Sequence, residues 1–145
     1  MAQAVADAVC KEKLGIRLSP YGVFNEIVPD DTTEQQYTSL ALGLKKTGIA
    51  YIHIVDHSSM GAPAVPQKIK GIIRNNFQGT IILSGGYDAA RAEADLEAGK
   101  GELVAFGRAF ISNPDLVERM AADALLAEPD PNTFYTPGEK GYTDY

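Results

Sequence analysis

The sequence predicts an α/β fold with a parallel sheet, because strand-like and helix-like segments alternate strictly along its 145 residues. Four short apolar segments have the length and β-branched content of strands, at 14–19, 49–55, 80–84 and 102–106. Their starts are separated by 35, 31 and 22 residues, close to the roughly 31 residues per unit of a (β/α)8 barrel of roughly 250 residues. Four such units make half of a barrel, although a small doubly wound sheet would show the same order.

The helices between the strands are predicted from apolar periodicity and from end signals. The first of them repeats apolar residues at i, i+3, i+4 and i+7, which are Tyr37, Leu40, Ala41 and Leu44. Thr32 with Gln35 predicts a capping box before this face, and Gly48 predicts a left-handed end after it. The next helix is expected to start with Pro66 as its first residue and to stop at Gly79.

Two further helices are expected, one capped by Asp88 and one capped by Asn113 with Pro114 as its first residue. Residues 1–12 are also predicted to be helical, with one apolar side formed by Ala4, Val5, Ala8 and Val9. We therefore expect residues 1–127 to form a half-barrel of four βα units preceded by a helix. Residues 128–145 are dense in proline, glycine and aspartate, which predicts an extended tail, and three tyrosines in it suggest that the tail packs near the mouth of the barrel.

Composition excludes several classes of protein. The net charge of −6 disfavours a nucleic-acid partner, and no apolar run approaches the roughly 18 residues of a membrane-spanning helix. The single cysteine, Cys10, excludes an internal disulfide and zinc sites built from several thiolates. We therefore expect a soluble, acidic, cytoplasmic protein without a membrane partner.

Glycines follow the third and fourth strands directly, as Gly85-Gly86 and Gly107-Arg108. Glycines at the carboxyl ends of parallel strands let backbone N–H groups approach an anion, and an arginine adds a forked, charged donor. In barrels, the loops after strands seven and eight often bind phosphate, and these two turns would fall there in a second half-barrel. The alternative is that Gly85-Gly86 is only a tight turn and Arg108 a solvated charge.

Alternation along the first strand places Arg17 on the face opposite Leu14, Ile16 and Leu18, which in a barrel is the interior. An inward guanidinium must meet a ligand or an internal carboxylate. His53 is expected to be a hydrogen-bonded interior residue, and the alternative is a functional one. His57 and Asp56 lack a third ligand, so no metal site is predicted. Ser58 and Ser59 lack the context of a nucleophile and are expected to cap the loop.

Five motifs cover essentially the whole chain, namely LGIRLSPYGVFN, IAYIHIVD, ILSGGYDAARA, LVAFGRAFISNPDLVERM and NTFYTPGEKGYTDY. Together they resemble the C-terminal half of the Old Yellow Enzyme family of flavin ene-reductases. The resemblance implies the second half of a (β/α)8 TIM barrel that holds FMN. It also implies NAD(P)H as reductant and an electrophilic alkene, quinone or nitro compound as substrate, with hydride delivered from the flavin N5.

Carried over by position, the resemblance implies that Arg17 contacts the pyrimidine edge of the flavin. Gly85, Gly86, Gly107 and Arg108 would hold the FMN phosphate, and Tyr87 would lie beside the dimethylbenzene end. Family members often have asparagine where this chain has Gly86, so one side-chain donor is lost. Phe134 and Tyr135 resemble the aromatic wall of the substrate site, and their alternative role is to anchor the tail. The loop 57–63, with Met60, departs from the family pattern.

The resemblance places the catalytic residues in the N-terminal half of the barrel, so none is expected in this chain. The chain is accordingly expected to be a fragment whose partner is the missing N-terminal half-barrel or a second copy of itself. The alternative to an FMN-binding half is a non-enzymatic half-barrel that binds no flavin and self-associates.

Overall fold

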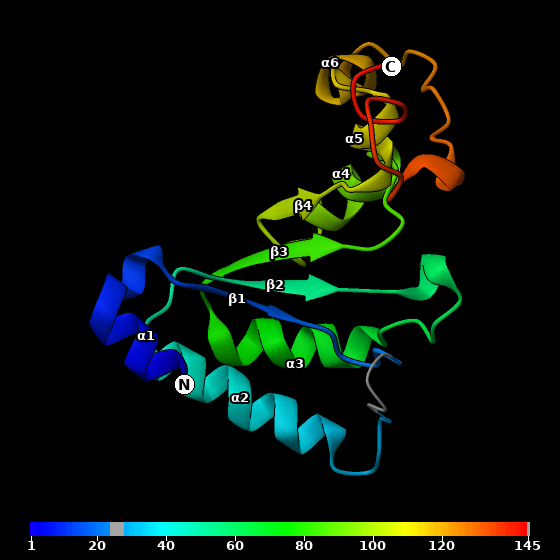
Figure 1. The fold of residues 1–145 in the computed structure, drawn as a ribbon. Helices are drawn as coiled ribbons and strands as arrows, with labels where there is room; N and C mark the ends of the chain where they lie inside the picture. Colours follow the sequence, from blue (N-terminus) through cyan, green and yellow to red (C-terminus); the bar gives the residue numbers. More distant parts are fainter. Residues whose placement is uncertain (24–27, 145) are drawn as a thin grey trace. The chain divides into compact units, whose positions relative to one another are not determined.

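The computed structural model describes residues 1–23 and 28–144, and its ribbon is drawn in Figure 1. Residue contacts divide the chain into two compact units, Met1–Ala105 and Phe106–Tyr145. Each unit is described by itself below. The last residue of the predicted tail, Tyr145, lies outside the described residues, as do positions 24–27, where the motif LGIRLSPYGVFN ends.

The first unit contains a sheet of four parallel strands in the order β1-β2-β3-β4. The strands are β1 Gly15–Leu18, β2 Tyr51–Val55, β3 Thr80–Ser84 and β4 Leu103–Ala105. The predicted α/β class with parallel βα units is therefore confirmed. A doubly wound sheet reverses its strand order at a switch point, whereas here every strand pairs with its neighbour in sequence, as in a barrel.

Six α-helices are described, four of them in the first unit. These are α1 Ala2–Val9, α2 Thr33–Thr47, α3 Gln67–Phe77 and α4 Ala89–Glu97. The second unit contains α5 Arg108–Ser112 and α6 Leu116–Ala121. Short 3₁₀ turns are found at Lys11–Lys13, Ser58–Met60 and Pro131–Thr133.

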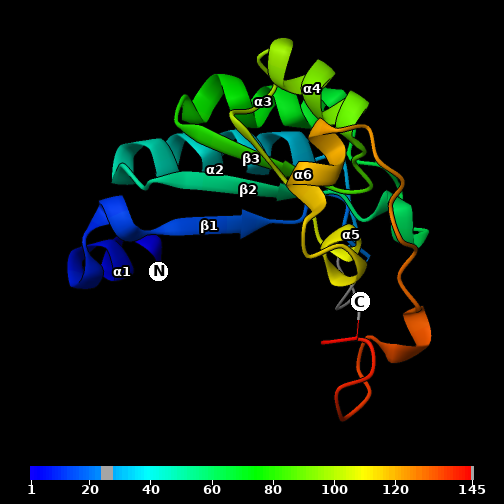
Figure 2. The ribbon, with the colours of Figure 1, turned by 90° about the horizontal axis from the view of Figure 1, so that it is seen from above.

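The core of the first unit lies between one face of the sheet and the helices α2 and α3. Alternate strand residues point to this face and are almost fully buried, namely Ile52, Ile54, Ile81 and Leu83. They pack against Ala41 and Leu44 of α2 and against Ile69, Ile73 and Phe77 of α3. Figure 1 shows α2 and α3 side by side beneath β1 and β2, and Figure 2 shows the same layers from above.

The opposite face of the sheet is open within this unit. Tyr51 is 39% exposed and Leu103 is 52% exposed, although both are large apolar residues at strand positions. Gly15 pairs with Tyr51, and a Cβ at Gly15 would lie 2.2 Å from an atom of the Tyr51 ring, so this glycine makes room for the ring. The apolar side predicted for the first helix is exposed as well, because only Ala6 of α1 is buried. A sheet face of this kind is the interior of a closed barrel.

Local details differ from the prediction at two helix starts, and those of a third are as predicted. Thr32 precedes α2, but its side chain makes no capping bond, and Gln36 rather than Gln35 reaches back to the Thr32 hydroxyl. Asp30 instead organises this turn by accepting from the Thr32 N–H at 2.8 Å. Pro66 is the N-cap of α3 and not its first helical residue. The predicted cap at Asp88 is confirmed, since its carboxylate accepts from the Arg91 N–H.

The helix predicted to begin at Asn113 and Pro114 is also wrong in its start. Helix α5 begins earlier, at Arg108, and chain irregularity at Asn113–Pro114 separates it from α6. Asn113 is only 1% exposed, and its side chain bonds to Ala109, Ser112 and both backbone groups of Ala127. A buried side chain that is bonded to so many partners fixes the break between the helices and does not serve as an exposed cap.

Candidate functional site

Arg17 lies on the open face of the sheet and is exposed. Its register neighbours across the sheet are His53, Ile82 and Leu103. Within the part of the chain that the structure describes, no hydrogen bond or ion pair engages its guanidinium, so an internal carboxylate partner is not found there. The positive charge of Arg17 is therefore available to a ligand on this face.

His53, the neighbour of Arg17 on β2, is half-buried on the same face. Its Nε2 atom is buried and has no hydrogen-bond partner among the described residues, so the expected interior hydrogen bond is not made by this atom. Burial lowers the pKa of His53, and the positive charge of Arg17 lowers it further. His53 is thus held neutral beside a cation.

The turn after β3 has backbone conformations that favour glycine. Gly85 has φ of +121° and Gly86 has φ of +61°, both in the region that side chains disfavour. A Cβ at Gly85 would lie 2.3 Å from the backbone oxygen of Asp56, and one at Gly86 would lie 3.0 Å from the Cβ of Ser59. The loop after β2 therefore packs directly against this turn, and its backbone is exposed at Gly86.

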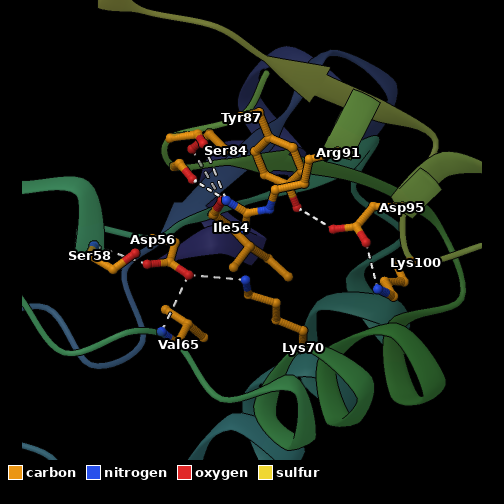
Figure 3. A network of polar contacts seen from close by, with 12 residues as sticks. Ile54, Asp56, Ser58, Val65, Lys70, Ser84, Tyr87, Arg91, Asp95 and Lys100 are labelled. Atoms are coloured by element: carbon orange, nitrogen blue, oxygen red, sulfur yellow. Dashed lines mark hydrogen bonds and ion pairs between the residues drawn. The ribbon is translucent and has the colours of Figure 1, made fainter. Parts of the chain in front are cut away.

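Asp56 anchors that loop through a buried ion pair with Lys70 of α3. The Lys70 Nζ lies 3.0 Å from Asp56 Oδ2, and the two side chains are 8% and 3% exposed. The same carboxylate accepts from the N–H groups of Ser58 at 3.0 Å and Val65 at 3.3 Å (Figure 3). Burial alone would raise the pKa of Asp56, but the hydrogen bonds from Ser58 and Lys70 outweigh it and lower the pKa. The charge next to the glycine turn is thereby neutralised.

Tyr87, the residue after the two glycines, is half-buried and turned toward α4. Its hydroxyl donates to Asp95 at 2.8 Å, and the guanidinium of Arg91 lies 4.1 Å from the centre of its ring (Figure 3). Burial and the Asp95 carboxylate raise the pKa of Tyr87 well above its usual value. The phenol is therefore a structural donor, and the flavin contact expected of this residue stays a prediction.

In the second unit, Gly107 precedes α5 and Arg108 is its first residue. Phe134 is half-buried, and its backbone carbonyl accepts from the Tyr142 hydroxyl at 2.8 Å. The side chain of Tyr135 is 96% exposed within the unit. The roles expected of these four residues stay predictions.

The structure thus assigns the predicted residues to three places. Gly85, Gly86 and Tyr87 form one turn, Arg17 lies in the same sheet two strands away, and the remaining residues belong to the second unit. From strand geometry, Arg17 and the turn are separated by about 10 Å across the sheet and about 10 Å along it. Among the described residues, no group of three histidine, cysteine, aspartate or glutamate side chains could hold a metal ion.

Three residues that organise the site were not singled out from the sequence: Asp56, Lys70 and Arg91. Lys70 carried a usable signal, because it lies within the apolar stripe of α3 between Ile69 and Ile73, where a buried charge needs a partner. Arg91 carried none, since an arginine on the first turn of a helix is usually a solvated residue.

Comparison with known proteins adds the family. The model of the NADH:flavin oxidoreductase / NADH oxidase family matches residues 1–126. The chain is 35% identical over 147 residues to a "12-oxophytodienoate reductase-like protein" of Solanum lycopersicum, spanning 100% of this chain and 39% of that protein. It is 34% identical over 143 residues to a "Probable flavin mononucleotide-dependent alkene reductase" of Leishmania infantum, spanning 98% and 38%.

A solved structure of morphinone reductase in complex with tetrahydroNAD is 42% identical, with a TM-score of 0.87, and the match covers 99% of this chain and 38% of that one. The chain belongs to the NADH:flavin oxidoreductase / NADH oxidase family, and the resemblance to Old Yellow Enzymes that its motifs predict is confirmed. It spans about 40% of the length of the curated relatives it matches. Within the described residues, no helix combines the length and apolar character needed to cross a membrane.

Proposed function

We propose that this chain is the FMN-binding half of an NAD(P)H-dependent oxidoreductase that reduces activated alkenes. The observation that carries the proposal is the open sheet face, which presents Arg17, without a partner among the described residues, on one strand and an exposed glycine turn at the end of another. A ligand that contacts both must be elongated and electron-rich at both ends. FMN meets this requirement, with a phosphate at one end and a pyrimidine edge at the other.

The residues present fit this cofactor. The positive φ angles at Gly85 and Gly86 leave backbone N–H groups uncovered where a phosphate would bind, and any side chain there would collide with the loop after β2 or strain the turn. Gly107 and Arg108, which lie within the residues that the family model matches, would complete the phosphate site. Tyr87 would border the dimethylbenzene end, and Phe134 with Tyr135 would wall the substrate.

Bound FMN would supply hydride transfer, accepting hydride from NAD(P)H and delivering it from N5 to an enone, quinone or nitro compound. The part of this chain in that chemistry is electrostatic. Arg17 would place a fixed cation at the edge that gains negative charge on reduction. His53, the neighbour of Arg17, is neutral and would therefore add no charge of its own at this edge. Acid chemistry on the substrate would come from the rest of the barrel.

The direct test is the absorbance spectrum and intact mass of the purified chain, followed by FMN titration. Binding is expected when the N-terminal part of the barrel is supplied as a second chain. Arg108→Ala should then weaken FMN binding by about 1.5–3 kcal/mol, the scale of a hydrogen bond to a charged group. A complete barrel that never takes up flavin would overturn the proposal and favour the alternative of a non-enzymatic half-barrel. Unchanged FMN affinity in the variant would remove Arg108 from the site.

A further inference from the structure

Arg91, on the first turn of α4, is bonded to the carbonyl side of the glycine turn. Its Nη1 donates to the carbonyl of Gly85 at 3.1 Å and to the carbonyl of Gly86 at 3.3 Å. Figure 3 shows the guanidinium lying over the ring of Tyr87 with its dashed bonds running to this turn. One side chain thus holds two consecutive peptide groups.

The orientation of those peptide groups follows from covalent geometry. In a planar trans peptide the carbonyl of one residue and the N–H of the next point in opposite directions. Because Arg91 binds the carbonyls of Gly85 and Gly86, the N–H groups of Gly86 and Tyr87 must face away from it. Neither N–H donates a hydrogen bond to any residue that the structure describes. Two adjacent, uncommitted N–H groups at a positive-φ turn form an anion-binding concavity.

Arg91 is itself fixed by its surroundings. Its guanidinium stacks on Tyr87, whose hydroxyl is bonded to Asp95, and Asp95 is also paired with Lys100. Its backbone N–H donates to the Asp88 carboxylate at 2.7 Å. A cation bonded to a peptide carbonyl also polarises that peptide and makes its N–H a better donor.

We propose that Arg91 is a positioning residue, which turns the N–H groups of Gly86 and Tyr87 toward a phosphate group on the opposite side of the turn. The proposal rests on the proposed function in that the phosphate is taken to be that of FMN. Arg91 acts on the phosphate through the turn, since its Nη1 binds the carbonyl side of the turn and the N–H groups face the other way. A lysine would not replace it, because a compact ammonium cannot bind two carbonyls and stack flat on a ring together.

The test uses inorganic phosphate as probe and, as readout, the backbone amide resonances of the ¹⁵N-labelled chain combined with the N-terminal part of the barrel. In the unmodified chain, phosphate should shift the Gly86 and Tyr87 signals saturably. Arg91→Met should weaken this response about tenfold, the scale of losing one good hydrogen bond. Arg91→Lys keeps the charge and should also weaken the response to phosphate. It is the second variant to use if Arg91→Met does not fold. Arg119→Met is the matched control: it removes a guanidinium that is bonded to Asp115 and not to the glycine turn, so it should respond as the unmodified chain does.

Two results would overturn the proposal: Gly86 and Tyr87 signals that ignore phosphate in the unmodified chain, or a folded Arg91 variant that responds normally. A parallel titration with FMN and riboflavin in the reconstituted barrel separates this proposal from the proposed function. Arg91→Met should weaken FMN binding and leave riboflavin binding unchanged, because riboflavin has no phosphate. If the barrel binds neither flavin while phosphate still moves both signals, the proposed function fails and the role of Arg91 stands.

Discussion

Arg17 and His53 are neighbours in the register of β1 and β2, and neither completes its polar contacts within the described residues. Leaving such groups without partners in a buried place costs about 1–3 kcal/mol each. Arg17 avoids this cost because it is exposed. His53 stays neutral and thereby avoids the larger cost of burying a charged group. Both residues therefore mark the open face as a surface that is completed by something else.

Arg17→Met is expected to lower the reduction potential of flavin bound to the reconstituted barrel. The reason is that the reduced, anionic flavin loses its nearest fixed cation while the oxidised form loses little. Spectroelectrochemical titration measures the potential directly. Arg17→Lys, which retains the charge, is the matched control and should recover part of the difference. A potential that is unchanged or higher in Arg17→Met would show that Arg17 does not face the flavin.

The lowered pKa of His53 predicts that the folded chain loses stability in acid. Its pKa is lower in the folded chain than its usual value of 6.5, so the unfolded chain takes up a proton first as the pH falls. The contribution of neutral His53 is complete above about pH 6.5 and declines below it. The interval from about pH 7.5 to about pH 5.5 spans the usual titration range of histidine. Over this interval the melting temperature of His53→Phe should therefore fall less than that of the unmodified chain. Equal slopes in the two proteins would contradict the prediction.

Some site residues could be predicted from the sequence and others could not. Arg17 interrupts an apolar alternation and Gly85-Gly86 follows a strand, so local pattern exposes both. Asp56 acts through its ion pair with Lys70 on α3, and Arg91 acts through two carbonyl groups of the preceding turn. These partners do not stand at a helical or strand spacing from the residues they contact. Such roles depend on how a loop and a helix meet, which the pattern of apolar residues does not encode.

Among the elements, the loop after β2 is held by a buried ion pair, in addition to the packing of Val65 in the core. Lys70→Met should destabilise the first unit by about 3–5 kcal/mol, because it leaves the Asp56 carboxylate buried without its cation. Urea unfolding followed by circular dichroism measures the change. The double variant Asp56→Leu/Lys70→Met is the control and should be more stable than Lys70→Met alone. A loss below about 1 kcal/mol, the value typical of surface pairs, would show that water reaches this pair.

The strands and their order could be predicted because each carries its own apolar alternation or run. The break between α5 and α6 could not. Asn113-Pro114 looks like a helix start, since asparagine caps helices and proline suits the first helical position. The burial of Asn113 by the segment at Ala127 decides otherwise, and that contact spans fourteen residues of sequence.

At the scale of the whole molecule, what matters is that the sheet of the first unit, as far as its residues are described, has two unpaired edges, β1 and β4, and one face left open within that unit. Exposed parallel edges and apolar groups such as Tyr51 and Leu103 favour association. We expect the isolated chain not to remain a well-folded monomer, and two copies could in principle close an eight-stranded ring with twofold symmetry. Light scattering at micromolar concentration with thermal unfolding tests this. A sharply melting species of 15.5 kDa would contradict it.

The consecutive strand order also governs how the chain can assemble in time. Each strand of this sheet pairs with the strand next to it in sequence: β1 with β2, β2 with β3 and β3 with β4. The entropy lost in closing each intervening segment therefore stays that of one βα unit. As the chain leaves the ribosome, each strand can add to a sheet that already exists, and synthesis from the N-terminus sets the order of pairing.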